Sequence, residues 1–247
     1  MKRKKSIKSM LFLTFTLALS ISIPFNAYAM HIAEGYLALN WCVFYFILAI
    51  PFVYLSIREL RKLIKNNSDI KMLLALMAAF VFMMSALKLP SVTGSSSHPT
   101  GTGLGAIIFG PLVMVIISVV VLLFQAILLA HGGLTTLGAN VLSMGIVGPF
   151  IAYGIYKLFK KKNEDIAVFL GCSLGNLMTY VITSIQLAMA FPATNGGVVA
   201  AAVKFLGVFA ITQVPLAIVE GIVSVIIFGF VKKYCSKELD ILEGGLL

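Results

Sequence analysis

The chain has 247 residues, of which 60% are apolar and only 11% are charged, and its formal net charge is +10. Soluble globular domains carry roughly a quarter charged residues, so this composition excludes a water-soluble fold. The positive charge does not indicate nucleic-acid binding, because Lys and Arg lie at the chain start, between apolar runs and near the chain end, and no basic face with interleaved aromatic residues is evident.

The first thirty residues have the pattern of a cleavable signal peptide. A basic head precedes an apolar stretch at 10–23, and Ala27-Tyr28-Ala29 forms an A-x-A cleavage site. The alternative is an uncleaved anchor helix, but the stretch has about 14 residues and a span needs roughly 20. We therefore predict a signal peptide at 1–29 and a single helical membrane domain at 30–247. The mature chain would begin with the free amine of Met30.

Six later apolar segments predict membrane-spanning helices. Only helices and closed barrels satisfy their backbone polar groups in lipid, and the alternation of period two that marks a barrel strand is absent. The predicted fold class is therefore an all-α membrane protein. The six segments are 36–57, 72–89, 107–130, 138–156, 166–191 and 203–231.

The basic loops indicate a seventh membrane segment. With Met30 outside and six helices, the Lys clusters at 157–162 and 232–237 would both lie outside, against the positive-inside rule. One further segment near 101–110, ended by Pro111, moves both clusters to the cytoplasmic side. About ten helical residues extend only some 15 Å, so neighbouring helices, tilt or extended chain must accommodate this piece. We expect a polytopic bundle of about seven segments with a cytoplasmic C-terminus.

Met30 and His31 would form a chelating N-terminus. The α-amine of Met30, the amide nitrogen of His31 and its Nδ1 can bind one ion through fused five- and six-membered rings. Such nitrogen donors suit late first-row ions, chiefly Cu(II), Ni(II) and Co(II). A fourth donor is expected from His98, because its loop falls on the same side of the membrane as Met30. The candidate metal ligands are therefore Met30, His31 and His98.

Four other polar residues have open roles. Glu34 is either a hydrogen-bonding neighbour of the metal site or a solvated loop carboxylate. We expect His131 to lie near the inner face, which favours a loop or partner-contact role over ligation. Lys88 lies close enough to a helix end to extend toward the interface. Glu220 lies inside an apolar helix and would pair within the bundle or face a partner subunit.

Three sequence runs resemble the signatures of one transporter family. Met30-His31-Ile32-Ala33-Glu34-Gly35-Tyr36-Leu37 resembles the start of mature CbiM and NikM proteins, the substrate-capture components of energy-coupling factor (ECF) transporters for cobalt and nickel. The runs that begin at Ser95 and at His131 are similar to the family's other two signatures. The likeness covers nearly all of 30–233.

The resemblance implies a six-helix core with one added N-terminal helix, and a metal ion held by Met30, His31 and His98. It also implies three partners: a small CbiN-like membrane subunit, a CbiQ-like coupling subunit and a CbiO-like ATPase. Because it has Glu34, the first run is more similar to the cobalt branch of the family. The nickel branch tends to have Asp at this position. The implied function is Co²⁺ import for cobalamin biosynthesis, with Ni²⁺ import as the alternative and no resident cofactor.

Two other classes of protein fit the sequence less well. A membrane metalloenzyme would need an acid or base beside its ligands, and the sequence has no His-Glu-x-x-His element. A self-sufficient channel or secondary transporter normally shows repeats or a path of ionisable groups, which are not evident. The sequence also has no G-x-x-x-x-G-K-[ST] loop, so ATP hydrolysis is expected only in a partner.

Overall fold

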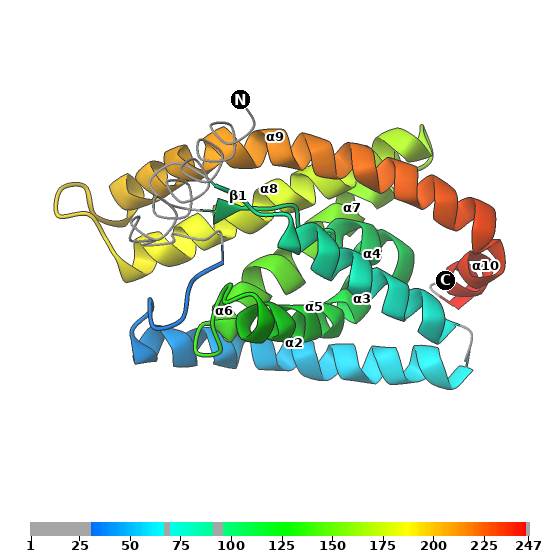
Figure 1. Ribbon diagram of the computed structural model, residues 1–247, viewed down its shortest axis with the longest axis horizontal. Helices are drawn as coiled ribbons and strands as arrows, with labels where there is room; N and C mark the ends of the chain where they lie inside the picture. Colours follow the sequence, from blue (N-terminus) through cyan, green and yellow to red (C-terminus); the bar gives the residue numbers. More distant parts are fainter. Residues whose placement is uncertain (1–30, 67–69, 91–95, 246–247) are drawn as a thin grey trace, which may run out of the picture.

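The computed structural model describes residues 31–66, 70–90 and 96–245 (Figure 1), so the predicted signal peptide and Met30 lie outside the described residues. The described chain is almost entirely helical, which confirms the predicted all-α class. Its strands form one two-residue antiparallel pair, in which Leu89 is opposite Ser97. In chain order the elements are α2 (Leu39–Asn66), α3 (Ile70–Ala86), β1 (Leu89–Pro90), β2 (Ser96–Ser97), α4 (Thr102–Phe109), α5 (Pro111–Leu128), α6 (Leu137–Asn140), a π-helical stretch (Val141–Val147), α7 (Gly148–Phe159), α8 (Glu164–Ala190), α9 (Gly197–Tyr234) and α10 (Ser236–Gly245).

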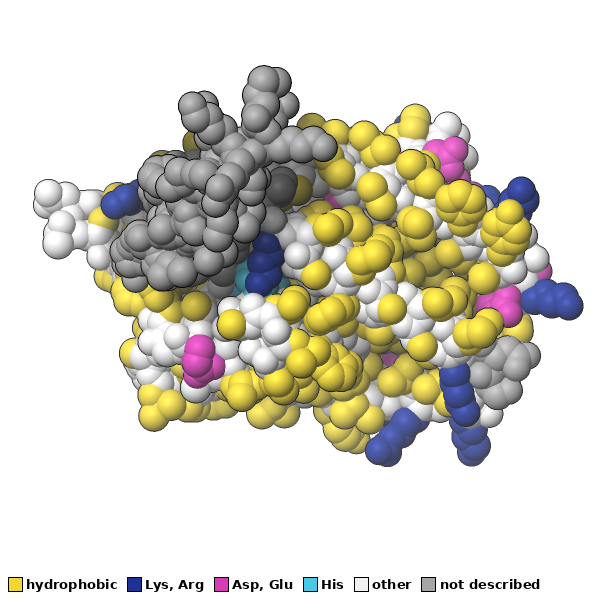
Figure 2. All heavy atoms as spheres, viewed as in Figure 1, with side chains coloured by type: hydrophobic (Ala, Val, Ile, Leu, Met, Phe, Trp, Pro, Cys, Tyr) yellow, Lys and Arg dark blue, Asp and Glu magenta, His cyan; other side chains and the backbone are white. Residues whose placement is uncertain are grey.

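Five of the described helical segments are long and apolar enough to cross a membrane: Leu39–Lys65, Pro111–Leu128, Leu137–Phe159, Glu164–Ala190 and Gly197–Tyr234. The shorter helix α3 is also apolar, with 17 residues. Large hydrophobic side chains such as Ile47 and Ile211 point outward, and hydrophobic side chains cover the visible face of the bundle (Figure 2). The protein is therefore a multi-pass membrane protein.

The short segment expected near 101–110 is α4. Gly101 and Gly110 flank it with φ angles of 69° and 85°, values that glycine adopts without a steric penalty, and Pro111 begins α5. All 8 residues of α4 are buried, and it packs against α5, α7 and α8. Neighbouring helices therefore shelter this short element, as its length of about 12 Å requires.

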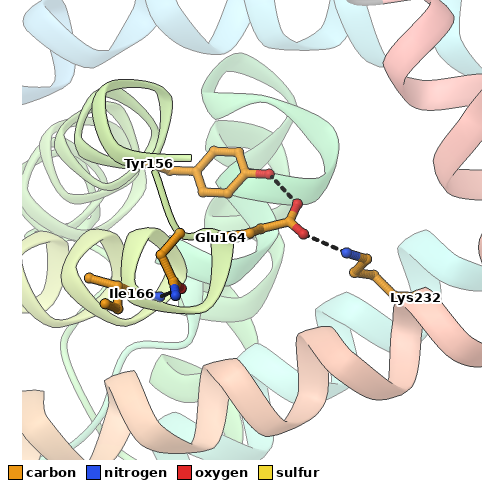
Figure 3. Close-up of polar contacts among 5 residues, drawn as sticks. Tyr156, Glu164, Ile166 and Lys232 are labelled. Atoms are coloured by element: carbon orange, nitrogen blue, oxygen red, sulfur yellow. Dashed lines mark hydrogen bonds and ion pairs between the residues drawn. The ribbon is translucent and has the colours of Figure 1, made fainter. Parts of the chain in front are cut away.

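Basic residues gather at one end of the bundle. The end of α2, the start of α3, the loop between α7 and α8, and the end of α9 with α10 all lie at that end in Figure 1. Most Lys and Arg side chains in Figure 2 are found there. Three helices are tied together at this end (Figure 3), because Glu164 at the start of α8 accepts a hydrogen bond of 3.1 Å from the Tyr156 hydroxyl and pairs with Lys232 of α9.

This arrangement predicts the outcome of cysteine labelling in intact cells. In a background without the natural cysteines, Asn195→Cys at the opposite end is expected to react with a membrane-impermeant maleimide. Lys161→Cys and Lys237→Cys are expected to react only after permeabilisation, because the positive-inside rule assigns their end to the cytoplasm. Reaction of Lys161→Cys in intact cells would contradict the predicted orientation.

Candidate metal centre

Three imidazoles meet beneath the loops at the end opposite the basic one. His31 precedes α2, His98 follows β2, and His131 follows α5. The ring centroids of His31 and His98 lie 4.7 Å apart, and each lies 4.9 Å from that of His131. His31 and His98 are fully buried, and His131 is 3% exposed. Residues up to 100 positions apart in sequence therefore form one compact cluster.

Four ring nitrogens of this cluster have no hydrogen-bond partner among the described residues. One ligand atom from each histidine lies within 4.8 Å of the others. Both ring nitrogens of His31 and the Nε2 atoms of His98 and His131 are buried and unpaired among the described residues. Unpaired buried polar atoms are costly, so a group of them converging on one point indicates a ligand. An ion about 2.1 Å from each nitrogen would hold them roughly 3–4 Å apart, and the three ligand atoms here lie no more than 4.8 Å apart.

His98 has its tautomer fixed by the chain. Its Nδ1 lies 2.8 Å from the carbonyl oxygen of Pro99. A carbonyl can only accept, so Nδ1 carries the proton and Nε2 keeps a free lone pair. A hydrogen bond from the second ring nitrogen is the usual support of a metal-ligating histidine. His98 is therefore prepared to donate through Nε2.

Burial keeps all three imidazoles neutral. It lowers the pKa of His31 well below the ordinary value, and the neighbouring His98 and His131 lower it further. Burial lowers the pKa of His98 to about 4, and it also lowers that of His131. Neutral imidazole is the form that binds metal.

Asn140 and Thr136 hold the segment that carries His31. The Asn140 side chain accepts from the backbone N–H of Ile32 at 2.9 Å and donates to its carbonyl at 3.1 Å. The Thr136 hydroxyl also donates to that carbonyl, at 2.6 Å. Both side chains come from the run that begins at His131, so this run fixes the residue next to His31.

Glu34 extends the same attachment. Its carboxylate accepts from the backbone N–H of Thr135 at 3.1 Å, and its own N–H donates to the carbonyl of Gly132 at 3.2 Å. The hydrogen bonds from Thr135 lower the pKa of Glu34. Of the two roles considered for Glu34, the structure supports hydrogen bonding near the site, and the bond is to the loop that carries His131.

A bend after α5 directs His131 into the cluster. Ala130 has a φ of 47°, a left-handed conformation that is uncommon for residues other than glycine. The backbone N–H of His131 donates to the backbone carbonyl of Gln125 at 3.1 Å, and the Lys88 ammonium donates to the carbonyl of Leu129 at 3.2 Å. Lys88 therefore supports this bend from just beyond α3.

The structure brings two predicted ligands, His31 and His98, into contact, while Met30 lies outside the described residues. The prediction that His131 lies near the inner face, away from the ligands, is wrong, since its ring contacts both. The physical reason is the path of the chain. From His98 it enters the bundle through α4 and returns through α5, so His131 lies at the same end as His98. One sequence signal could have indicated His131 as a ligand, since only 3 histidines occur in the chain.

Helices that cross a membrane and a buried cluster of neutral imidazoles define a membrane protein with a candidate site for a late first-row metal ion. The chain belongs to the CbiM family: residues 31–238 match the family model described as the cobalt uptake substrate-specific transmembrane region. This confirms the family predicted from the three sequence runs.

Two relatives cover nearly the whole chain. It is 59% identical to the cobalt transport protein CbiM of Clostridium tetani, over 94% of this chain and 97% of that protein. It is 54% identical to the cobalt transport protein CbiM of Thermosipho melanesiensis, over 96% of this chain and 100% of that protein. A crystal structure of a truncated transition metal transporter matches with a TM-score of 0.73 at 25% identity, over 83% of this chain and 99% of that one.

Proposed function

We propose that this chain captures Co²⁺ for an ATP-driven ECF importer that supplies cobalamin biosynthesis. The observation that carries the proposal is the convergence of three buried imidazoles, with four unpaired ring nitrogens, directly beside the position where Met30 joins His31. The relatives named as cobalt transport proteins support cobalt as the transported ion and a transport role rather than catalysis.

The proposed ligands are the Met30 amine, the His31 amide nitrogen and Nδ1, and the Nε2 of His98. These are the donors expected from the sequence. The proposal now adds His131, whose unpaired Nε2 lies in the same cluster and would give a fifth donor. Cleavage after Ala29 is part of this proposal, because the amine exists only in a chain that begins at Met30.

The proposed partners supply energy and coupling. They are a CbiN-like small membrane subunit, a CbiQ-like transmembrane subunit and a CbiO-like ATPase, since the sequence contains no phosphate-binding loop of its own. The mature N-terminus and the histidine cluster would lie outside, and the basic end with α10 would lie in the cytoplasm, where the ATPase has its nucleotide.

The test is metal analysis of the purified mature protein, with N-terminal sequencing of the same preparation. Sequencing is expected to begin at Met30, and the protein is expected to bind one Co²⁺. His31→Ala and His98→Ala each remove a donor, so each should lower affinity at least tenfold, the loss typical even of changes to groups around the ligands. Normal metal uptake by His31→Ala would overturn the proposal.

Nickel is the alternative cargo, because a planar set of nitrogen donors suits Ni(II) as well as Co(II). Competition between the two ions for the purified protein distinguishes these cases. A protein that binds Ni²⁺ but leaves Co²⁺ in solution when both are present would be a nickel importer of the same family.

A further inference from the structure

Glu220 is a fully buried carboxylate in the middle of α9. An ionisable residue within a membrane helix is expensive, and such residues generally serve a function. The metal centre described above does not include Glu220. Its surroundings therefore need an explanation of their own.

Four donors surround the Glu220 carboxylate. The backbone N–H of Thr100 lies 2.6 Å from one oxygen, which the Asn176 side-chain amide also contacts. The Thr100 hydroxyl and the backbone N–H of Gly101 lie 2.9 Å from the other oxygen. Each oxygen thus accepts two hydrogen bonds. This is the environment of an ionised carboxylate, which has only acceptors to offer.

The two backbone donors lie at the start of α4. Gly101 immediately precedes this helix, and no side chain of its own caps it. The first N–H groups of a helix lack partners within the helix and carry a partial positive charge. Glu220 accepts from the N–H of Gly101 at this end of the helix and from that of Thr100 one residue before it, so it fixes the point at which the chain enters α4.

That point is two residues beyond His98. Pro99 separates His98 from Thr100, and the carbonyl of Pro99 accepts the proton on His98 Nδ1. The proline ring restricts the backbone between the carboxylate and the imidazole. A displacement of Thr100 would therefore move both the His98 backbone and the carbonyl that orients its ring.

A second chain of contacts leads from Glu220 to the same histidine. Asn176, which donates to Glu220, accepts from the side-chain amide of Gln213. The Gln213 amide also lies 3.5 Å from the carbonyl oxygen of His98. Gln213 and Glu220 are seven residues apart on α9, two turns along one face. The same helix thus holds the loop at the carbonyl of His98 and again at Thr100.

We infer that Glu220 is a positioning residue for metal capture, which holds the His98 loop against α9 so that His98 Nε2 faces His31 and His131. The inference rests on the proposed function, because it assumes that His98 is a ligand. Glu220 does not contact the three imidazoles. It acts through the backbone of Thr100 and Gly101 and through Asn176.

The test uses Glu220→Gln, which keeps the shape of the side chain but turns one acceptor into a donor that must face existing donors. Purified full-length protein is titrated with Co²⁺, and the d–d absorption of the bound ion reports its ligands. Affinity is expected to fall at least tenfold, with a spectrum like that of His98→Ala. In the double variant the two losses should not add, because both remove the same donor.

Ser224→Ala is the matched control, since Ser224 is a buried polar residue one turn from Glu220 on α9, and its hydroxyl has no hydrogen-bond partner among the described residues. It should bind Co²⁺ like the unmodified protein. If Glu220→Gln does not yield folded protein, Thr100→Val tests the same contact by removing one donor, with a smaller loss and the same lack of additivity. Glu220→Asp, which keeps the charge, should recover part of the affinity.

The outcomes separate the two proposals. If His98→Ala weakens Co²⁺ binding but Glu220→Gln and Thr100→Val do not, or if their losses add to that of His98→Ala, Glu220 has only a structural role. If His98→Ala itself leaves binding unchanged, the proposed ligand set fails instead.

Discussion

Insertion of one alanine between Met30 and His31 is expected to abolish cobalt uptake while leaving a chain that binds Ni(II) or Cu(II). His31 should keep its place, because Asn140 and Thr136 fix the backbone of Ile32. The amine, however, moves one residue away. The chelate then gains a second amide nitrogen and closes its plane without His98, so the ion is no longer shared between the chain terminus and the loop.

The measurements are Co²⁺ uptake in cells and Ni(II) titration of purified protein, each with and without His98→Ala. In the unmodified chain His98→Ala should weaken Ni(II) binding at least tenfold, and in the insertion variant it should have no effect. An alanine inserted between Thr194 and Asn195, in the exposed loop before α9, controls for the change in length and should preserve uptake. Uptake that survives the insertion at Met30 would rule out the N-terminal chelate.

Local physical rules were sufficient for much of the fold. Hydrophobic length predicted the spans because lipid leaves the backbone few alternatives to the helix. The distribution of Lys and Arg required one more segment, and Pro111 marked where it ends. The structure has α4 at that place, bounded by Gly101 and Gly110. Hydropathy alone did not identify α4, since its 8 residues are too few for a hydropathy window.

The candidate site was predicted only in part. In a chain that begins at Met30, covalent adjacency would make Met30 and His31 a chelate whatever the fold, so sequence chemistry alone predicts that pair. The position of His131 depends instead on how many times the chain passes through the bundle before it reaches residue 131. Counted through α4 and α5, that path returns residue 131 to the end that carries His31.

The contacts that fix the site are long-range. Ile32 bonds to Asn140 across 108 positions, and Thr100 bonds to Glu220 across 120. No spacing rule connects such residues in a single sequence. The sequence did single out Glu34, Lys88 and Glu220 as polar residues with open roles, and each makes a hydrogen bond to a loop of the site.

The N-terminal segment and the His131 loop lie close together at Gly133. A Cβ atom at this position would lie 2.5 Å from the Cα atom of Glu34 and 2.7 Å from its backbone nitrogen. Such contacts with backbone cannot be relieved by a rotamer change, so the two segments would have to separate. Their separation would break the hydrogen bonds between Glu34 and the loop and carry His31 away from His131.

Gly133→Ala is therefore expected to lower Co²⁺ affinity at least tenfold without removing any donor atom, because ligand geometry is set by the groups around it. Titration of purified protein measures the loss, and circular dichroism should show unchanged helix content, since the loop lies outside the helices. Gly154→Ala is the matched control: a Cβ there meets nothing within 4 Å, and alanine inside α7 should leave affinity unchanged and raise stability by about 0.5–1 kcal/mol. Equal affinities for the two variants would mean that the loop does not set the position of His31, and that the attachment through Ile32 is sufficient by itself.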